Sequence, residues 1–169
     1  LALVMVFSLA ACGNKNSGTT SKEDTNKTEK PKTVTIKSFN ANNEETDLEV
    51  PYDAQRIAVM DMAALDILDS LGLGDRVVGS SSTSLDYLQE YVTNDEIVDL
   101  GTIKEADMEA VMSCEPDVIF IGGRLAQSYD ALSEIAPVVY LSTDTEIGLV
   151  KVWRKMQRRL HLCLVWKMM

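Results

Sequence analysis

Residues 116–144, P-D-V-I-F-I-G-G-R-L-A-Q-S-Y-D-A-L-S-E-I-A-P-V-V-Y-L-S-T-D, decide the fold of this chain. The apolar run at residues 118–121 is continuous, which is typical of a strand buried on both faces. The glycine pair at residues 122–123 ends that run and predicts a tight backbone turn. Apolar residues at helical spacing follow until Pro137, and a second apolar run occupies residues 138–141. The stretch therefore predicts a strand–loop–helix–strand unit.

Arg124 is placed at the carboxyl end of the first of these predicted strands. In open parallel sheets, ligands bind outside the carboxyl ends of the strands. Arg124, with Gly123 beside it, is therefore a candidate ligand contact. The alternatives for Arg124 are a surface salt bridge or a residue at the start of the helix.

The segments before this unit alternate between strand and helix patterns. Residues 33–50 contain two β-branched, alternating runs around a turn-rich centre, which predict a hairpin. Single strands are predicted at residues 56–60, 76–79 and 97–100. This alternation implies one α/β lobe over residues 33–144, built on a parallel sheet with helices on both faces and an N-terminal edge hairpin.

Helical spacing predicts the segments between the strands. Helices are expected at residues 63–71, at 85–91 with Tyr87, Leu88 and Tyr91 inward, and at 105–114 with Met108, Val111 and Met112 as the apolar stripe. Gly72 and Gly74 follow a helix and not a strand, so they predict a helix-ending glycine turn and not a dinucleotide fingerprint. Cys114 is expected to be a buried thiol.

The order of these segments resembles the membrane-anchored iron–siderophore-binding proteins of bacterial ABC importers, in the wider iron/cobalamin-type periplasmic binding family. The matching motifs are Ile121-Gly122-Gly123-Arg124, Ile135-Ala136-Pro137 and the strand at residues 56–61. The resemblance implies a substrate-binding component for iron uptake, an anionic ferric siderophore as ligand, an ABC permease as partner and Arg124 as a ligand contact. It also implies a fold of two lobes with the ligand between them.

Further candidate ligand contacts lie where the other predicted strands end. They are Asp61, Met62, Ser81, Ser82, Gly101 and Thr102. A helix N-cap is the alternative for Asp61, and a solvated loop is the alternative for the serines.

Other functions remain open at the level of sequence. Haem or cobalamin is the alternative ligand within the same family, and an enzyme with an α/β nucleotide-binding lobe is the alternative outside it. No phosphate loop, nucleophile elbow or spaced acid/base pair is found, so we expect no enzyme and no cofactor. The single histidine, His161, lies in the C-terminal tail. The net charge of −10 argues against a nucleic-acid partner.

The first 12 residues predict export and lipidation. Residues 1–11 are apolar and uncharged, as in the core of a signal peptide. Residues 9–12, L-A-A-C, resemble a bacterial lipobox, which implies that Cys12 carries a lipid anchor on the extracytoplasmic face of the membrane. A plain secretory signal is the alternative, and we expect the segment to be incomplete because it lacks a basic start. Residues 13–32 are polar and predict a flexible tether.

The C-terminal end changes in composition. Residues 145–150 predict the start of an inter-lobe helix, and residues 151–169 contain no acidic residue but six basic ones: Lys151, Arg154, Lys155, Arg158, Arg159 and Lys167. Synonymous codons for this tail, shifted by one base, are compatible with an acidic helical string. We therefore expect a frameshifted tail, no second lobe and weak or no ligand binding. The alternative is a genuine basic amphipathic helix.

Overall fold

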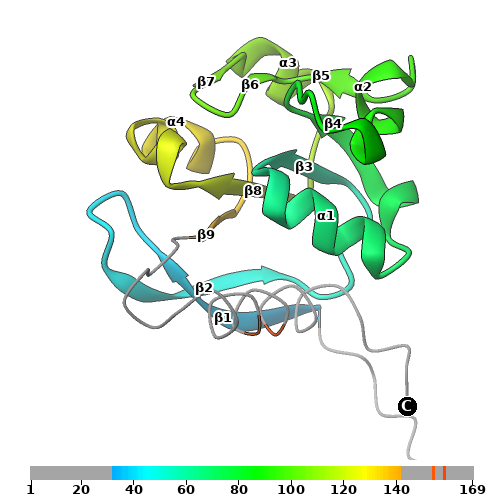
Figure 1. The fold of residues 1–169 in the computed structure, drawn as a ribbon. Helices are drawn as coiled ribbons and strands as arrows, with labels where there is room; N and C mark the ends of the chain where they lie inside the picture. The colour runs from blue at the N-terminus through cyan, green and yellow to red at the C-terminus, as the bar shows by residue number, and fades with distance from the viewer. Residues whose placement is uncertain (1–31, 142–153, 155–157, 159–169) are drawn as a thin grey trace, which may run out of the picture. The chain divides into compact units, whose positions relative to one another are not determined.

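The computed structural model describes residues 32–141 together with Arg154 and Arg158, which are exposed and helical (Figure 1). The predictions for Cys12, for the tether before residue 32, for residues 145–150 and for the rest of the tail lie outside the described residues. Within the described part, no helix has the length and apolar character needed to cross a membrane.

An antiparallel hairpin opens the described chain, as predicted. Its alternating side chains place Ile36 and Val50 in the core while their neighbours face solvent. Asn40 holds the turn, because its side chain accepts hydrogen bonds from the backbone N–H groups of Asn42 and Glu44. The two strands are β1 (Thr33–Phe39) and β2 (Glu45–Pro51).

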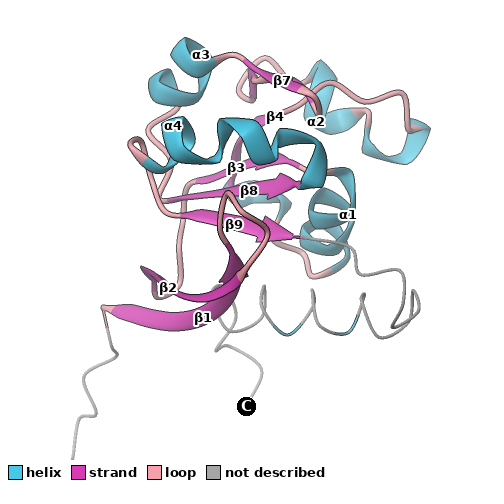
Figure 2. Ribbon diagram, turned by 90° about the vertical axis from the view of Figure 1, so that its left-hand side faces the viewer, coloured by secondary structure: helices cyan, strands magenta, loops and turns pink. Residues whose placement is uncertain are grey.

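The main sheet has five parallel strands in the order β5-β4-β3-β8-β9. The arrowheads of β8 and β9 point to the same side in Figure 2. The central strands are continuous apolar runs because both faces of the sheet are covered. The strands are β3 (Ile57–Met60), β4 (Val77–Ser80), β5 (Val98–Asp99), β8 (Val118–Gly122) and β9 (Val138–Leu141).

Alternate side chains of each central strand enter two separate cores. In β8, Phe120 packs with Leu65 and Leu68 of α1 and with Ile36 of the hairpin. Its neighbour Ile121 packs on the opposite face, where Leu125 and Leu132 lie. The predicted arrangement of helices on both faces of a parallel sheet is therefore confirmed.

The helices are short. The first face is covered by α1 (Met62–Ser70), α2 (Glu90–Thr93) and the hairpin, and the second face by α3 (Met108–Ser113), α4 (Tyr129–Ser133) and the 3-10 helix η3 (Gly123–Ser128). Two further 3-10 turns are η1 (Gly74–Arg76) and η2 (Asp86–Leu88). The glycine turn after α1 is confirmed, because Gly72 has φ +68° and Leu73 N–H donates to the carbonyl of Leu68.

Two helix predictions need correction. Residues 85–91 form η2 and the start of α2, and Tyr87 is 60% exposed instead of facing inward, although Leu88 and Tyr91 are buried. The helix predicted from Glu105 begins three residues later at Met108, with Asp107 as its N-cap.

A small hairpin replaces the missing first turn of α3. Its antiparallel strands are β6 (Gly101–Thr102) and β7 (Glu105–Ala106). Met112 was predicted in the apolar stripe of α3 and is 57% exposed, because a helix this short buries only Val111 fully.

Ser38 joins the hairpin to the outer strand of the main sheet. Its Oγ accepts a hydrogen bond of 3.0 Å from the backbone N–H of Tyr140 in β9, and both residues are buried. We expect Ser38→Ala to lower the free energy of unfolding by about 1–3 kcal/mol, because it leaves a buried N–H without an acceptor. Urea unfolding measures this, and amide hydrogen exchange at Tyr140 should become faster.

The matched control is Thr35→Ala, which removes an exposed hydroxyl from the same strand. It should change the free energy of unfolding by about 0.5 kcal/mol or less. Equal effects of the two substitutions would show that the Ser38–Tyr140 bond contributes nothing to stability.

Candidate functional site

The strand order creates one place where the chain changes direction across the sheet. From β3 the chain proceeds to β4 and β5 on one side, and it then returns to β8 and β9 on the other side. The chain therefore leaves the adjacent strands β3 and β8 in opposite directions across the sheet. Ligands of open α/β sheets bind at such a point, outside the carboxyl ends of the strands.

Asp61 and Gly122 meet at this point. Met60 is paired with Ile121 in the parallel register, so the next residue of each strand lies at the same edge. A side-chain carbon on Gly122 would overlap Oδ2 of Asp61. Neither Gly122 nor Gly123 has a positive φ. The strand ends and the chain turns at this pair as predicted, since β8 ends at Gly122 and η3 begins at Gly123. At Gly122, glycine is required because it makes room for the Asp61 carboxylate.

Asp61 caps α1, as the alternative interpretation of its sequence position proposed. Its Oδ1 accepts a hydrogen bond of 2.9 Å from the backbone N–H of Ala64. Burial raises the pKa of the Asp61 carboxyl above its ordinary value, although the N–H groups of Ala64 and Ala63 and the charge of Arg124 act in the opposite direction. The Asp61 carboxylate and the Arg124 guanidinium are thus electrostatic neighbours across the two loops.

This raised pKa predicts how stability depends on pH. A carboxyl whose pKa is higher in the folded state contributes stability at low pH and loses it as pH rises through the folded pKa. We expect Asp61→Asn, which keeps the cap acceptor, to flatten the stability profile above about pH 4. Urea unfolding at several pH values measures the slope.

Asp61→Ala is the comparison that isolates the cap. It removes the acceptor as well as the charge, so it should be about 1 kcal/mol less stable than Asp61→Asn at every pH. A wild-type slope that survives in Asp61→Asn would mean that another group causes it.

Arg124 is the second residue of η3, and its side chain is exposed. Among residues 32–141, no hydrogen bond or ion pair engages its guanidinium. Other arginines of this part are engaged: Arg56 donates to two backbone carbonyls and Arg76 pairs with Asp53. Arg124 therefore presents a fork of free donors at the edge where the chain changes direction.

Ser81 and Ser82 follow β4, and Gly101 follows β5, so these residues lie at the neighbouring strand ends. Ser82 N–H donates to the carbonyl of Gly101, and Ser81 N–H donates to that of Val59. Ser82 is exposed, whereas Ser81 is fully buried and its Oγ finds no hydrogen-bond partner in the described part of the chain. Gly101 has φ +88°, and a side chain there would meet the carbonyl oxygen of Glu105 at 2.7 Å. Gly101 thus has a structural role in the turn.

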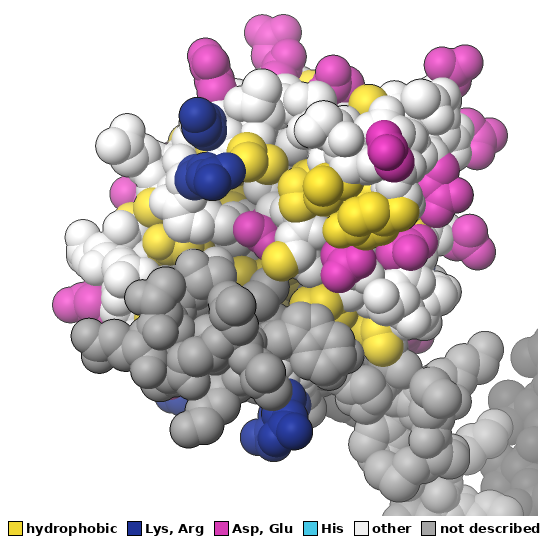
Figure 3. Space-filling view, viewed as in Figure 1, with side chains coloured by type: hydrophobic (Ala, Val, Ile, Leu, Met, Phe, Trp, Pro, Cys, Tyr) yellow, Lys and Arg dark blue, Asp and Glu magenta, His cyan; other side chains and the backbone are white. Residues whose placement is uncertain are grey.

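The β6–β7 hairpin brings Lys104, which the sequence analysis did not identify, to this region. The predicted candidate Thr102 holds the turn of this hairpin, because its Oγ1 accepts hydrogen bonds from the backbone N–H groups of Lys104 and Glu105. The turn presents Lys104, which is exposed, and β7 packs against η3. Figure 3 shows dark-blue basic side chains close together at the upper left, over the region of β7 and η3. The sequence analysis predicted a helix from Glu105 onward, so it did not place Lys104 in the turn of a hairpin.

Met62 is the remaining candidate, and it is half-buried against the core beneath α1. The structure therefore brings Asp61, Gly123 and Arg124 together at one edge. Ser82, Gly101 and Thr102 follow along the adjoining strand ends. The hydroxyl of Ser81 is buried inside the protein, and the hydroxyl of Thr102 is engaged in the turn of the β6–β7 hairpin.

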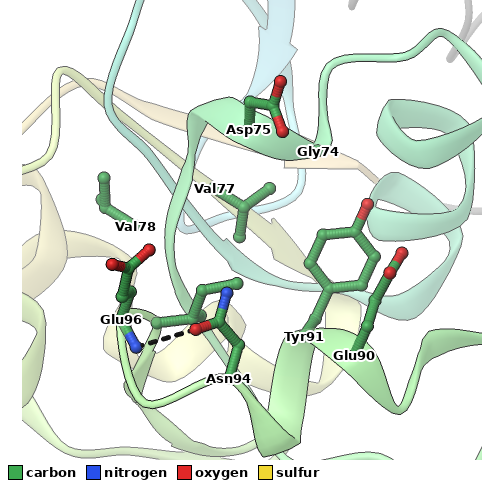
Figure 4. A pocket seen from close by; sticks show the side chains of 9 residues that line it. Gly74, Asp75, Val77, Val78, Glu90, Tyr91, Asn94 and Glu96 are labelled. Carbon is green, nitrogen blue, oxygen red and sulfur yellow. Dashed lines mark hydrogen bonds between the residues drawn. The ribbon is translucent and has the colours of Figure 1, made fainter.

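A separate hollow lies at the opposite end of β4. Its volume is about 450 Å³, and α2 and the β4 entrance line it (Figure 4). The lining carries carboxylates and no basic residue, and Asn94 Oδ1 accepts a hydrogen bond from Glu96 N–H. The lining residues are Gly74, Asp75, Val77, Val78, Glu90, Tyr91, Asn94, Glu96 and Ile97. This hollow is lined from the first half of β4, whereas the serines that follow β4 lie at its carboxyl end, and its carboxylates disfavour an anionic ligand.

A parallel sheet with a change of direction at β3 and β8, and with free cationic donors at that edge, defines an α/β ligand-binding lobe. The chain belongs to the periplasmic binding protein family, whose model matches residues 57–160. The resemblance identified from the sequence motifs is thereby confirmed.

Two curated relatives are named as binding proteins for petrobactin and for ferric anguibactin. The chain is 36% identical over 145 residues to the petrobactin-binding protein YclQ of Bacillus subtilis, a match that covers 86% of this chain and 43% of YclQ. It is 32% identical over 91 residues to the ferric-anguibactin-binding protein FatB of Vibrio anguillarum, covering 53% of this chain and 28% of FatB. The chain thus spans less than half the length of these relatives.

Solved structures show the same fold. The crystal structure of YclQ superposes with a TM-score of 0.69 at 28% identity, covering 79% of this chain and 46% of YclQ. The periplasmic catecholate-siderophore-binding protein VctP of Vibrio cholerae gives a TM-score of 0.67 at 28% identity, covering 78% of this chain and 46% of VctP. Residues 32–141 therefore have the architecture of one lobe of such a protein.

Proposed function

We propose that this chain supplies a ferric-siderophore-contacting lobe of a substrate-binding protein that serves an ABC importer in iron uptake. The observation that carries the proposal is the free guanidinium of Arg124 beside Gly123, at the edge where the sheet changes direction. Ferric siderophores are bulky anionic chelates, and a guanidinium offers them several donors in a fixed geometry. The named ligands of YclQ, FatB and VctP support this ligand class.

The role is binding and not catalysis. The relatives named above are binding proteins, and the proposed site holds donors without an acid/base pair around a reacting atom. We place the protein on the extracytoplasmic face of the membrane, held there by lipid on Cys12 and delivering its ligand to a permease. Labelling of bacteria with an alkyne analogue of palmitate tests the anchor, since Cys12→Ser should abolish incorporation and unchanged incorporation would exclude it.

The affinity of this chain alone should be modest. A hydrogen bond that involves a charged group contributes about 1.5–3 kcal/mol, and Arg124 and Lys104 are the two cations placed at the edge. With one such bond each, they contribute about 3–6 kcal/mol in total. A Kd of about 1 mM corresponds to about 4 kcal/mol and a Kd of about 1 μM to about 8 kcal/mol, so the Kd should lie well above 1 μM. A sub-micromolar Kd would show that the proposed contacts are not the whole site.

Nuclear magnetic resonance of the isotope-labelled chain tests the proposal at this affinity. The ligand is gallium(III) petrobactin, a diamagnetic analogue of the ferric complex. Amide signals of Ser82, Gly101, Thr102, Gly123 and Arg124 should shift, while those of the hairpin turn at residues 40–44 should not.

Haem and cyanocobalamin are titrated in parallel, because they are the alternative ligands within the family. Shifts at these edge residues with gallium(III) petrobactin support the proposal. An absence of shifts up to about 1 mM, or shifts produced only by haem or cyanocobalamin, would contradict it.

A further inference from the structure

The side chain of Tyr140 lies beneath the proposed site but belongs to a different strand. Tyr140 is the third residue of β9 and pairs with Ile121 of β8. Its ring packs in the core under η3 and α4, with the ring centre 5.9 Å from that of Phe39 and 6.5 Å from that of Tyr129. Only 4% of the residue is exposed. The ring is therefore held in a fixed position.

The hydroxyl of Tyr140 reaches solvent although its ring is buried, because Ser81 Oγ is the only fully buried side-chain oxygen or nitrogen without a partner in the described part of the chain. No hydrogen bond to its Oη is found among residues 32–141. Tyr91, the other buried tyrosine of this part, donates from its Oη to Asp69 over 2.7 Å. Tyrosine combines an apolar ring with a polar tip that usually finds a hydrogen-bond partner. A solvent-accessible hydroxyl at the end of a fixed ring is therefore available to an acceptor from outside the chain, either water or a ligand.

Gly123 shows where that hydroxyl is directed. A side-chain carbon built on Gly123 would lie 3.5 Å from Tyr140 Oη. Gly123 is exposed and immediately precedes Arg124 in η3. The hydroxyl thus lies next to a residue that has no side chain to cover it, one position before Arg124. Glycine at this position leaves the hydroxyl uncovered on the side of this edge.

We propose that Tyr140 Oη donates a hydrogen bond past Gly123 to an oxygen of the same anionic chelate that Arg124 binds. This inference rests on the proposed function and adds a neutral donor on a fixed ring to the exposed cations at the edge. Burial raises the pKa of the Tyr140 hydroxyl, so it keeps its proton at neutral pH. A neutral donor fixes the orientation of the chelate and favours ligands with an acceptor oxygen at that place.

The direct test is Tyr140→Phe, which removes the oxygen and keeps the packed ring. Affinity for gallium(III) petrobactin, measured by titration of amide shifts, should fall about tenfold to a hundredfold, as expected for one hydrogen bond to a charged acceptor. The midpoint of thermal unfolding should stay the same or rise, because the hydroxyl has no partner in the protein. Tyr91→Phe is the control, since it removes a hydroxyl that is already paired, and it should leave affinity unchanged.

Gly123→Ala provides an independent test through a double-mutant cycle. Gly123 has no positive φ, so alanine is tolerated there and its methyl group covers the Tyr140 hydroxyl at van der Waals distance. Gly123→Ala should weaken binding in the wild-type background and have little further effect in Tyr140→Phe. Equal losses in both backgrounds would show that the methyl group obstructs the ligand directly, which would overturn the role of the hydroxyl.

The outcomes separate this inference from the proposed function. If the wild-type chain binds and Tyr140→Phe binds equally well, the hydroxyl serves only a water molecule and this inference is wrong, while the proposed function stands. If gallium(III) petrobactin produces no shifts in the wild-type chain, the proposed function itself fails. A loss confined to Tyr140→Phe and Gly123→Ala, with Tyr91→Phe unchanged, supports both.

Discussion

Replacing Phe120 by alanine should lower the free energy of unfolding by about 3–5 kcal/mol, the largest loss that we expect from a single side chain of this lobe. Phe120 is fully buried at the centre of β8, between Val59 of β3 and Val139 of β9. Its ring connects the sheet with α1 and the hairpin. Removing it takes away apolar burial and leaves a cavity that a close-packed sheet cannot fill by small movements. Urea unfolding followed by circular dichroism measures the loss.

Two further variants make the result interpretable. Tyr87→Ala removes an aromatic side chain that is 60% exposed, so it should change stability by about 0.5 kcal/mol or less. Phe120→Leu keeps most of the volume and should cost less than about 1.5 kcal/mol, which provides a measurable variant if the alanine protein does not fold. Similar losses for Phe120→Ala and Tyr87→Ala would contradict the position of Phe120 in the core.

Arg124→Gln should weaken the binding of gallium(III) petrobactin by about tenfold to a hundredfold. This range corresponds to the loss of about 1.5–3 kcal/mol from hydrogen bonds of a charged donor to an anionic ligand. Arg124→Lys keeps the charge without the planar fork and should give an intermediate affinity. Stability should change by about 0.5 kcal/mol or less, because the side chain is exposed and makes no hydrogen bond or ion pair in the described part of the chain. Titration of amide shifts and urea unfolding measure the two effects.

Lys37→Gln is the matched control for charge. Lys37 lies on the hairpin in an exposed pair with Asp47 at 2.7 Å, so its removal lowers the net charge equally without touching the edge of the sheet. It should leave affinity within about twofold of wild type, as expected when added salt screens exposed charges separated by more than a Debye length of about 10 Å. Equal losses in Arg124→Gln and Lys37→Gln would show a general charge effect and no specific contact at Arg124.

The sequence determined the layered α/β fold because burial on both faces leaves a local pattern. The continuous run of residues 118–121 predicted a central strand, and the structure places all four residues in the core. Local hydrogen bonding is also encoded locally, so the cap at Asp61 and the turn at Gly72 followed from residue type and position. The same stretch identified Arg124 as a candidate, because it directly follows a predicted strand.

Tertiary structure alone decided which strand ends meet and which side chains they share. The strand order places β8 beside β3, so the Asp61 carboxylate fills the space over Gly122, 61 residues away in the sequence. Pairing between β6 and β7 overrode the helical spacing from Glu105 and brought Lys104 toward η3. Tyr140 resembles any other apolar strand residue in the sequence, and only the parallel register with Ile121 places its hydroxyl next to Gly123. Such contacts join residues distant along the chain, and no local periodicity records them.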